Sequence, residues 1–243
     1  MNKVGLFGTC RVKIINTQDD FKKIKFDDLP YVYKNNNIQI NIRPLGYTTT
    51  TSDIYQNLSL IHSNFYKKIN DTFLFNNIFL KRGGKSIITD LDYDCIVLEI
   101  CSIKKLIHLK SNLVIPYEVE GEFIPSEYIT KSECYNETIE NIQKIQKLLN
   151  CKIILLPPIT EISGYIQIGK HENTFPNKVL EYRKDIIARL IKASDNKNIF
   201  LFNWNKIINE KGEKFIMQDQ FHFTNEGKKY IGEKLINFIT QNI

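Results

Sequence analysis

Five short apolar runs recur along the chain, and polar or amphipathic segments separate them. Most of these runs are continuous, which is typical of strands that are buried on both faces; the run IQINI alternates. Gly, Pro or polar residues bound them. The pattern predicts strands over residues 3–7, 38–42, 94–100, 152–156 and 199–202.

Four segments carry apolar residues at helical spacing. The first follows a cluster of Thr and Ser residues that can cap a helix, and the last lies close to the end of the chain. The pattern predicts helices over residues 53–68, 136–149, 177–192 and 228–239.

Strands that alternate with helices predict a parallel sheet with helices on both faces. We expect one domain, residues 1–243, folded as a three-layer α/β/α sandwich around a five-stranded parallel sheet of flavodoxin-like topology. Residues 105–135 are the least regular part and are expected to form an insertion or a lid. In such sheets ligands bind beyond the carboxyl ends of the strands, so the segments that follow the strands are the places to search for a site.

Composition narrows the class of protein only slightly. The chain has 33 Lys+Arg and 27 Asp+Glu, a net charge of +6, and no basic block, which favours a solvated surface over a nucleic-acid partner. No run of 18 apolar residues and no signal-peptide pattern occurs, so no membrane partner is expected. The five cysteines lack CxxC spacing, which favours reduced thiols in a cytoplasmic setting without a metal site, and no cofactor is expected.

The first segment with candidate chemistry is Gly8-Thr9-Cys10-Arg11, directly after the first expected strand. A nucleophile on a sharp turn there is exposed beside backbone N–H groups that can stabilise an oxyanion. A thiol suits this position because a nearby cation or helix N-terminus lowers its pKa. The spacing from Gly8 favours Cys10 over Thr9 as nucleophile, and a small buried cysteine behind a glycine turn is the alternative.

The second segment is Asp219-Gln220-Phe221-His222, just before the last expected helix. A separation of three residues puts Asp219 and His222 on one side of a single turn. The carboxylate can then orient the imidazole as a general base. A surface turn with a helix cap at Thr224 explains the same pattern without catalysis.

Together these segments resemble the SGNH (GDSL-like) hydrolase superfamily over nearly the whole chain. Cys10 stands where that family usually has its catalytic Ser, as in the divergent branches whose first block reads Gly-Ser-Cys. Asp219 and His222 match the last block. Gly46 is placed like the glycine of the second block, and Ser102 follows the third strand, where the family has an Asn.

The resemblance implies an esterase or acyltransferase that acts on an O-acyl group, in the first instance acetyl, of a carbohydrate. Cys10 is then the nucleophile, His222 the base and Asp219 the residue that orients it. Cys10, Gly46 and Ser102 are expected to form the oxyanion hole. The expected partners are a small-molecule or glycan ester and an acyl donor.

The sequence also suggests a role for two arginines and leaves two alternative functions open. Arg11 and Arg43 fall at the ends of expected strands and can bind a carboxylate or phosphate of the substrate, or form structural ion pairs. One alternative function is a catalytically degenerate member of the family that binds a glycan or another ligand. The other is a nucleotide- or phosphate-binding domain that uses residues 8–11 as an anion loop.

Overall fold

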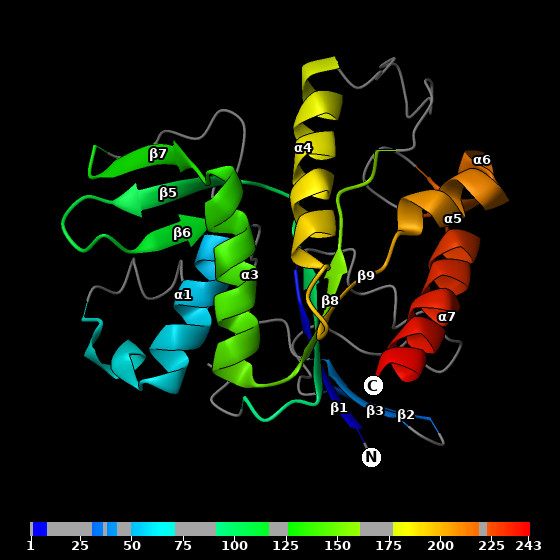
Figure 1. The fold of residues 1–243 in the computed structure, drawn as a ribbon, viewed down its shortest axis with the longest axis horizontal. Coiled ribbons are helices and arrows are strands. Elements are labelled where there is room, and N and C mark those ends of the chain that lie inside the picture. The colour runs from blue at the N-terminus through cyan, green and yellow to red at the C-terminus, as the bar shows by residue number, and fades with distance from the viewer. Residues whose placement is uncertain are drawn as a thin grey trace.

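The main sheet has six strands in the order β2-β3-β1-β4-β8-β9 (Figure 1). The computed structural model describes residues 2–8, 31–35, 38–42, 50–70, 91–116, 126–160, 177–218 and 223–243. Every pairing in this sheet is parallel except that of β2 with β3. Its strands are β1 (Asn2–Phe7), β2 (Tyr31–Asn35), β3 (Ile38–Ile42), β4 (Cys95–Glu99), β8 (Lys152–Leu156) and β9 (Ile199–Leu201).

All five expected strands are present and run parallel, but the expectation of a five-stranded sheet is wrong in strand number. A sixth strand, β2, pairs antiparallel with β3 at the edge. Its sequence YVYKN contains no continuous apolar run, because an edge strand does not need one, and it therefore escaped the pattern. The order of the five parallel strands is that of flavodoxin-like, doubly wound sheets.

A second sheet lies within the segment where an insertion or a lid is expected. Its three antiparallel strands are ordered β6-β5-β7, and it lies to one side of the main sheet (Figure 1). The Gln56 side chain ties it to α1 with two hydrogen bonds of 2.7 Å, one to each backbone polar group of Val114. The strands are β5 (Lys104–His108), β6 (Val114–Pro116) and β7 (Tyr128–Ser132).

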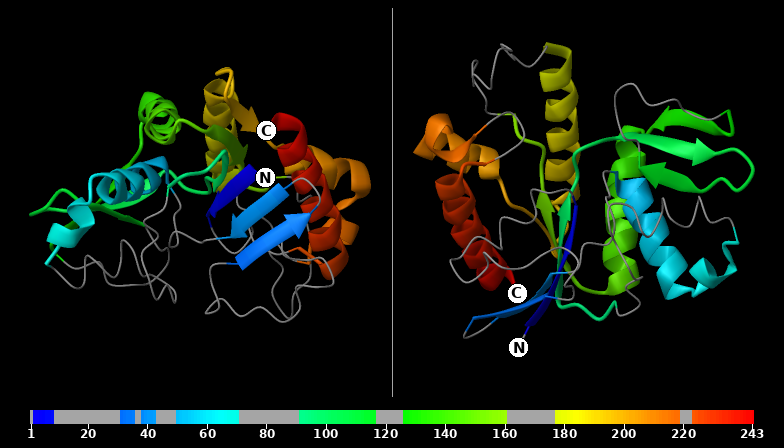
Figure 2. Two further views of the ribbon diagram at one scale, coloured as in Figure 1. Left: turned by 90° about the horizontal axis from the view of Figure 1, so that it is seen from below. Right: turned by 180° about the vertical axis from the view of Figure 1, so that it is seen from behind.

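Helices cover both faces of the main sheet, which makes the architecture three-layered (Figures 1 and 2). One face carries α1 (Thr51–His62), α3 (Tyr135–Leu149) and α4 (Asn177–Ala193). The other carries α5 (Trp204–Lys211), α6 (Glu213–Ile216) and α7 (Asn225–Asn242). No helix in the described part of the chain is long and apolar enough to cross a membrane.

The first expected helix is shorter than its pattern suggests. It was expected over residues 53–68, but α1 ends at His62 and a short 3-10 helix, η4 (Phe65–Lys68), follows. Asn64 between them has a φ of 57°, a left-handed conformation that Asn tolerates and that interrupts an α-helix. The chain therefore turns between two segments whose apolar spacing is continuous.

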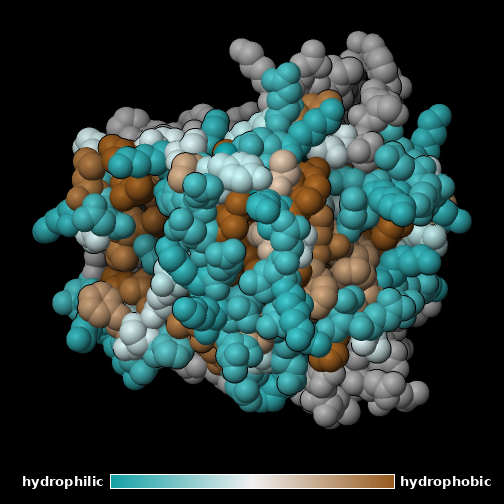
Figure 3. Space-filling model, viewed as in Figure 1, coloured by the Kyte–Doolittle hydropathy of each residue, from teal (hydrophilic) through white to brown (hydrophobic). Residues whose placement is uncertain are grey.

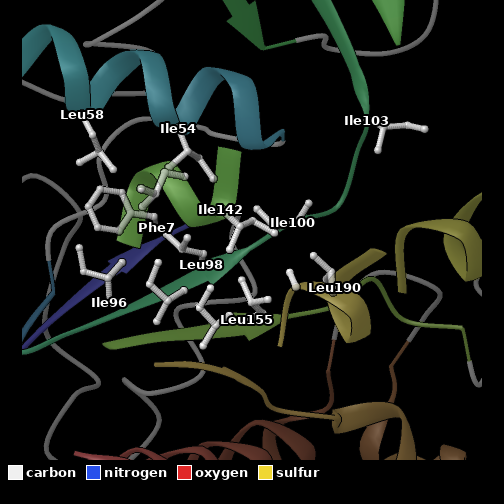
Figure 4. Close-up of a cluster of buried hydrophobic side chains, with 14 of the residues drawn as sticks. Phe7, Ile54, Leu58, Ile96, Leu98, Ile100, Ile103, Ile142, Leu155 and Leu190 are labelled. Atoms are coloured by element: carbon white, nitrogen blue, oxygen red, sulfur yellow. The ribbon is translucent and has the colours of Figure 1, made fainter. Parts of the chain in front are cut away.

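The strands alternate between two hydrophobic cores. All five residues of β4 are buried. Ile96 and Leu98 belong to the core under α1, α3 and α4, whereas Cys95 and Val97 belong to the core under α5, α6 and α7. Figure 4 shows Leu98 of β4 and Ile54 of α1 among the side chains of the first of these cores. Burial on both faces explains why the sequence of this strand has no polar alternation.

We expect Gly227→Ala to destabilise the protein. A Cβ at Gly227 lies 2.1 Å from the carbonyl oxygen of Ile216, so α7 and α6 have to move apart. The clash should lower the free energy of unfolding by about 1–3 kcal/mol, measured by urea denaturation. Asn237→Ala, on an exposed position of the same helix, is the control and should change it by less than about 0.5 kcal/mol. Equal effects of the two substitutions contradict the close approach.

Candidate functional site

The strand order predicts a ligand crevice at one edge of the main sheet. β1 pairs with β3 on one side and with β4 on the other. The connections that leave β1 and β4 therefore lead to opposite sides of the sheet, and in doubly wound folds ligands bind at such a switch point, beyond the carboxyl ends of the two strands. Phe7 pairs with Leu98 near this edge, so Gly8 and Glu99 border the predicted crevice. The candidate nucleophile segment follows Gly8 directly.

Gly8 gives β1 a sharp end. Its φ is 151°, a backbone conformation that residues other than glycine rarely adopt, and the residue is buried. A turn at this position is what the sequence predicts. Seven of the predicted site residues lie outside the described residues: Thr9, Cys10, Arg11, Arg43, Gly46, Asp219 and His222.

Ser102 is the one predicted oxyanion residue that lies in the described part of the chain. Its Oγ lies 3.0 Å from the hydroxyl of Tyr182 on α4 and accepts a 2.9 Å hydrogen bond from the backbone N–H of Lys104. The N–H of Ile103 also donates to the Tyr182 hydroxyl, at 2.8 Å. Ser102 therefore holds the turn between β4 and β5 against α4, and either hydroxyl can be the donor in its bond to Tyr182.

Glu99 is a buried carboxylate at the crevice that the sequence analysis left without a role. It ends β4, and its side chain is inaccessible to solvent. A carboxylate is costly to bury unless protein groups bind it. The sequence does contain a signal for Glu99, because it is a charged residue at the end of an otherwise apolar strand.

The segment that contains Asp219 and His222 is anchored at both ends. Met217 and Phe223 form an antiparallel bridge, and both are buried. The ring of Phe223 lies 5.7 Å from that of Trp204, which comes just after the carboxyl end of β9. The chain therefore enters and leaves this segment at the carboxyl edge of the sheet, the edge that Gly8 borders.

The last helix begins immediately after this segment. Thr224 is its N-cap: the Thr224 Oγ1 accepts a 2.8 Å hydrogen bond from the N–H of Gly227 and donates one of 2.6 Å to the carbonyl of Phe215. The helix cap expected at Thr224 is thus confirmed. Figure 1 shows α7 running back toward the N-terminal end of β1, so its first turn lies toward the carboxyl ends of the strands.

The segment that follows β8 is held in place from two helices. The Asn205 side chain donates to the carbonyl of Pro158 and accepts from the N–H of Thr160, both at 2.9 Å. The guanidinium of Arg183 donates to the carbonyl of Ile159. These contacts fix a further part of the carboxyl edge.

Two of the four described cysteines are unsuited to be a thiol nucleophile. None of the described cysteines, Cys95, Cys101, Cys134 and Cys151, forms a disulfide. Burial, reinforced by the neighbouring Cys151, raises the pKa of Cys95 far above its usual range. Burial and the charge of Asp94 raise the pKa of Cys151 to about 12. These two thiols stay protonated at neutral pH and are poor nucleophiles.

No metal centre emerges from the residues that the structure describes. Among them, no group of three or more His, Cys, Asp or Glu side chains could hold an ion.

A second polar cluster, which we call the Glu133 network, lies where α1 and α3 begin. Glu133 is only 2% exposed, and its carboxylate accepts hydrogen bonds from the Thr51 hydroxyl (2.9 Å), the Ser52 N–H (2.6 Å) and the Thr138 hydroxyl (3.0 Å). Arg189 on α4 donates to the backbone carbonyl of Glu133 at 2.9 Å. The positive ends of two helix dipoles thus face one carboxylate, which stabilises its charge.

Lys105 adds the small sheet to this network. Its ammonium group donates to the Ser52 hydroxyl at 2.9 Å and to the carboxylate of Glu137. Burial alone raises the pKa of Glu137, but the hydrogen bond and charge of Lys105, with hydrogen bonds from Ser52 and the Cys134 backbone, outweigh it and lower the pKa.

The Glu133 network was not predicted from the sequence, although part of its signal is present there. Thr50 with Asp53, and Cys134 with Glu137, form two capping boxes, a pattern visible as a spacing of three residues. The long-range partners Lys105 and Glu133 have no such local signal.

Comparisons with known proteins leave this chain without a family. No family model and no curated protein matches it. A solved structure that it resembles is the N-terminal part of the protein BF1531 from Bacteroides fragilis, which contains a phosphatase domain and is complexed with Mg. The identity is 12% and the TM-score 0.41. The match covers 98% of this chain and 51% of that one, so this chain spans about half of its length.

We expect Tyr182→Phe to weaken the anchor of the β4–β5 turn. The change leaves the N–H of Ile103 without its acceptor and the Ser102 hydroxyl without one partner. Urea denaturation should show a loss of about 1–2 kcal/mol. Tyr135→Phe is the control, because Tyr135 is 42% exposed and its hydroxyl bonds to no described residue; it should change stability by less than about 0.5 kcal/mol. No difference between the two variants contradicts the role of Tyr182.

The stability contributed by Glu137 should depend on pH. Since its pKa is lower in the folded protein than in the unfolded chain, the contribution is complete above the ordinary value of 4.5 and is lost as pH falls through the folded value. The difference in unfolding free energy between wild type and Glu137→Gln should therefore be largest near neutral pH and shrink below about pH 4.5. Urea denaturation at a series of pH values measures it.

Glu140→Gln is the matched control for this pH series. Glu140 lies 3.6 Å from Lys144 in an exposed ion pair, which contributes little to stability. The difference in unfolding free energy between wild type and Glu140→Gln should be small at every pH of the series. A Glu137→Gln difference that stays constant from neutral pH to about pH 3 contradicts the coupling to Lys105.

Proposed function

We propose that the protein is an SGNH-like esterase or acyltransferase that cleaves or transfers an O-acyl group, in the first instance acetyl, on a carbohydrate. The observation that carries the proposal is the placement of two distant segments at one sheet edge. Gly8 ends β1 at the crevice, and Phe223, next to His222 in the chain, packs on Trp204 after β9. The flavodoxin-like strand order adds support, since it predicts a ligand site at this edge.

In the proposed reaction the thiol of Cys10 is the nucleophile. His222 takes the thiol proton as the sulfur attacks the carbonyl carbon of the ester, and Asp219 orients the imidazole. The tetrahedral intermediate then expels the alcohol, which receives the proton from His222, and a thioester with Cys10 remains. Water or a second hydroxyl group attacks this thioester and releases the acid or the new ester.

The proposed oxyanion hole consists of the N–H groups of Cys10 and Gly46 and the hydroxyl of Ser102. Ser102 stands where the family has an Asn, so this chain lacks the usual side-chain donor of the third block. Because one missing donor costs about 10²–10³ in rate, the proposal includes a slow enzyme or one that depends on its acceptor. Arg11 and Arg43 would bind a negatively charged group of the substrate.

Hydrolysis of 4-nitrophenyl acetate tests this proposal. Cys10→Ala and His222→Ala should each reduce kcat/KM at least about 100-fold, because each removes a group that takes part in the chemistry. Mass spectrometry of the quenched reaction should find the acetyl group on the peptide that contains Cys10. Cys134→Ser is the matched control: it removes a thiol outside the proposed site, keeps a side chain that can cap α3, and should leave kcat/KM unchanged.

Four outcomes count against the proposal. Activity that both variants retain, or acetylation of another cysteine, removes Cys10 and His222 from the reaction. If the wild-type protein lacks esterase activity but acetylated glycans raise its melting temperature, it is a degenerate binding domain. Stabilisation by nucleotides instead favours the phosphate-binding function of residues 8–11.

A further inference from the structure

The small sheet has one closed edge and one open edge. β6 forms the closed edge, because the Gln56 side chain bonds to the backbone N–H and C=O of Val114, the groups that point away from β5. β7 forms the other edge, on the side of β5 away from α1 (Figure 1). An edge strand with unpaired backbone groups can pair with a strand of another chain.

The pairing of β7 with β5 determines which backbone groups of β7 point outward. The N–H of Leu109 donates to the carbonyl of Glu127 at 2.7 Å, and the N–H of Glu133 donates to the carbonyl of Ile103 at 2.8 Å. Residues of odd number in β7 therefore bond to β5, and residues of even number direct their N–H and C=O groups outward. Thr130, in the middle of the strand, is exposed, and no described residue bonds to its backbone groups.

One face of the small sheet carries a row of apolar side chains that reaches this open edge. Val114 lies opposite Ile107, and Ile107 lies opposite Ile129, on three neighbouring strands. All three side chains are only half-buried, whereas a solvated face of an antiparallel sheet usually carries polar residues. Figure 3 shows apolar surface on the side of the molecule that carries the small sheet. Exposed apolar surface beside an open strand edge is typical of a protein interface.

The side chains along the open edge are complementary to a copy of themselves. Glu127, just before β7, Ile129 and Lys131 occupy alternate positions and so point to the face that carries the apolar row. Glu127 and Lys131 are exposed, and neither forms an ion pair with a described residue. If an identical strand runs antiparallel with Ile129 opposite Ile129, each Glu127 lies opposite a Lys131. Such cross-strand pairs of opposite charge are stabilising.

The backbone is compatible with the same register. Thr130 then lies opposite Tyr128 of the second copy, and both are residues of even number, as a hydrogen-bonded pair requires. The two Ile129 residues form a pair without hydrogen bonds between them, in which side chains lie closest together. A register centred on Thr130 would use the same backbone groups but would put Lys131 opposite Ile129. The charges therefore favour the register centred on Ile129.

We propose that two copies of the chain form a dimer through β7, with the strands antiparallel and Ile129 on the two-fold axis. The two small sheets join into one sheet of six strands, and the apolar row runs from Val114 of one copy to Val114 of the other. Gln56 closes the opposite edge of each small sheet, so the assembly ends at two copies. The dimer uses none of the residues of the reaction proposed above and does not depend on it.

Sedimentation velocity of the full chain at about 1–500 μM tests the dimer. A single pair of short strands makes a small interface, so we expect a dissociation constant on the order of 10–100 μM. Lys131→Glu and Glu127→Lys each replace two pairs of opposite charge with two pairs of like charge. Each should weaken the dimer about tenfold or more. Both residues are exposed, so the melting temperature of each variant should stay close to that of the wild type.

Exchange of the charges tests the register. The double variant with both Glu127→Lys and Lys131→Glu restores the two pairs and should dimerise as the wild type does. A mixture of the two single variants should form a heterodimer, because both pairs across it then join opposite charges. Lys197→Glu is the control: it makes the same charge change at an exposed turn before β9 and should leave the dissociation constant unchanged.

Each other result overturns the proposal. A wild-type protein that stays monomeric up to about 500 μM does not form this dimer. A dimer that Lys131→Glu does not weaken forms through another surface. If the double variant dimerises as weakly as the single variants, or if their mixture forms no heterodimer, the strands do not pair with Ile129 opposite Ile129.

Discussion

The pairing of β1 with β3 on one side and β4 on the other is the constraint on which the rest of the structure depends. It puts β1 inside the sheet, so its residues must be apolar toward both helical layers: Leu6 belongs to one core and Phe7 to the other. It also divides the connections that leave β1 and β4, and such a switch point predicts a ligand site between them. Gly8 ends β1 at the border of that predicted site.

The Glu133 network connects elements of the fold by charge and hydrogen bonds, where the two cores connect them by hydrophobic contact. Helix dipoles, hydroxyls and Arg189 surround Glu133, and the pair formed by Lys105 and Glu137 joins the small sheet to the same helices. Removing one member of such a cluster leaves a buried charge without its partner, so the members stabilise one another.

The sequence predicted the parts of the fold that local patterns encode. The continuous runs at residues 94–100 and 152–156 correspond to β4 and β8, because strands buried on both faces leave no polar position. β5 (KKLIH) was missed as a strand: its Lys105 is buried only because Glu137, 32 residues later, pairs with it. Ser102 was placed correctly after a strand, but its bond to Tyr182, 80 residues away, has no local signal.

The functional proposal rests on Gly8 and Phe223, the described neighbours of the Cys10 and His222 segments, which lie at the same edge of the sheet. The most direct test is a crystal structure that resolves both side chains. The proposal predicts that the Sγ of Cys10 lies within about 3–4 Å of an imidazole nitrogen of His222, close enough for proton transfer. A separation of about 8 Å or more, both in the free protein and with a bound ester analogue, contradicts the Cys-His pair.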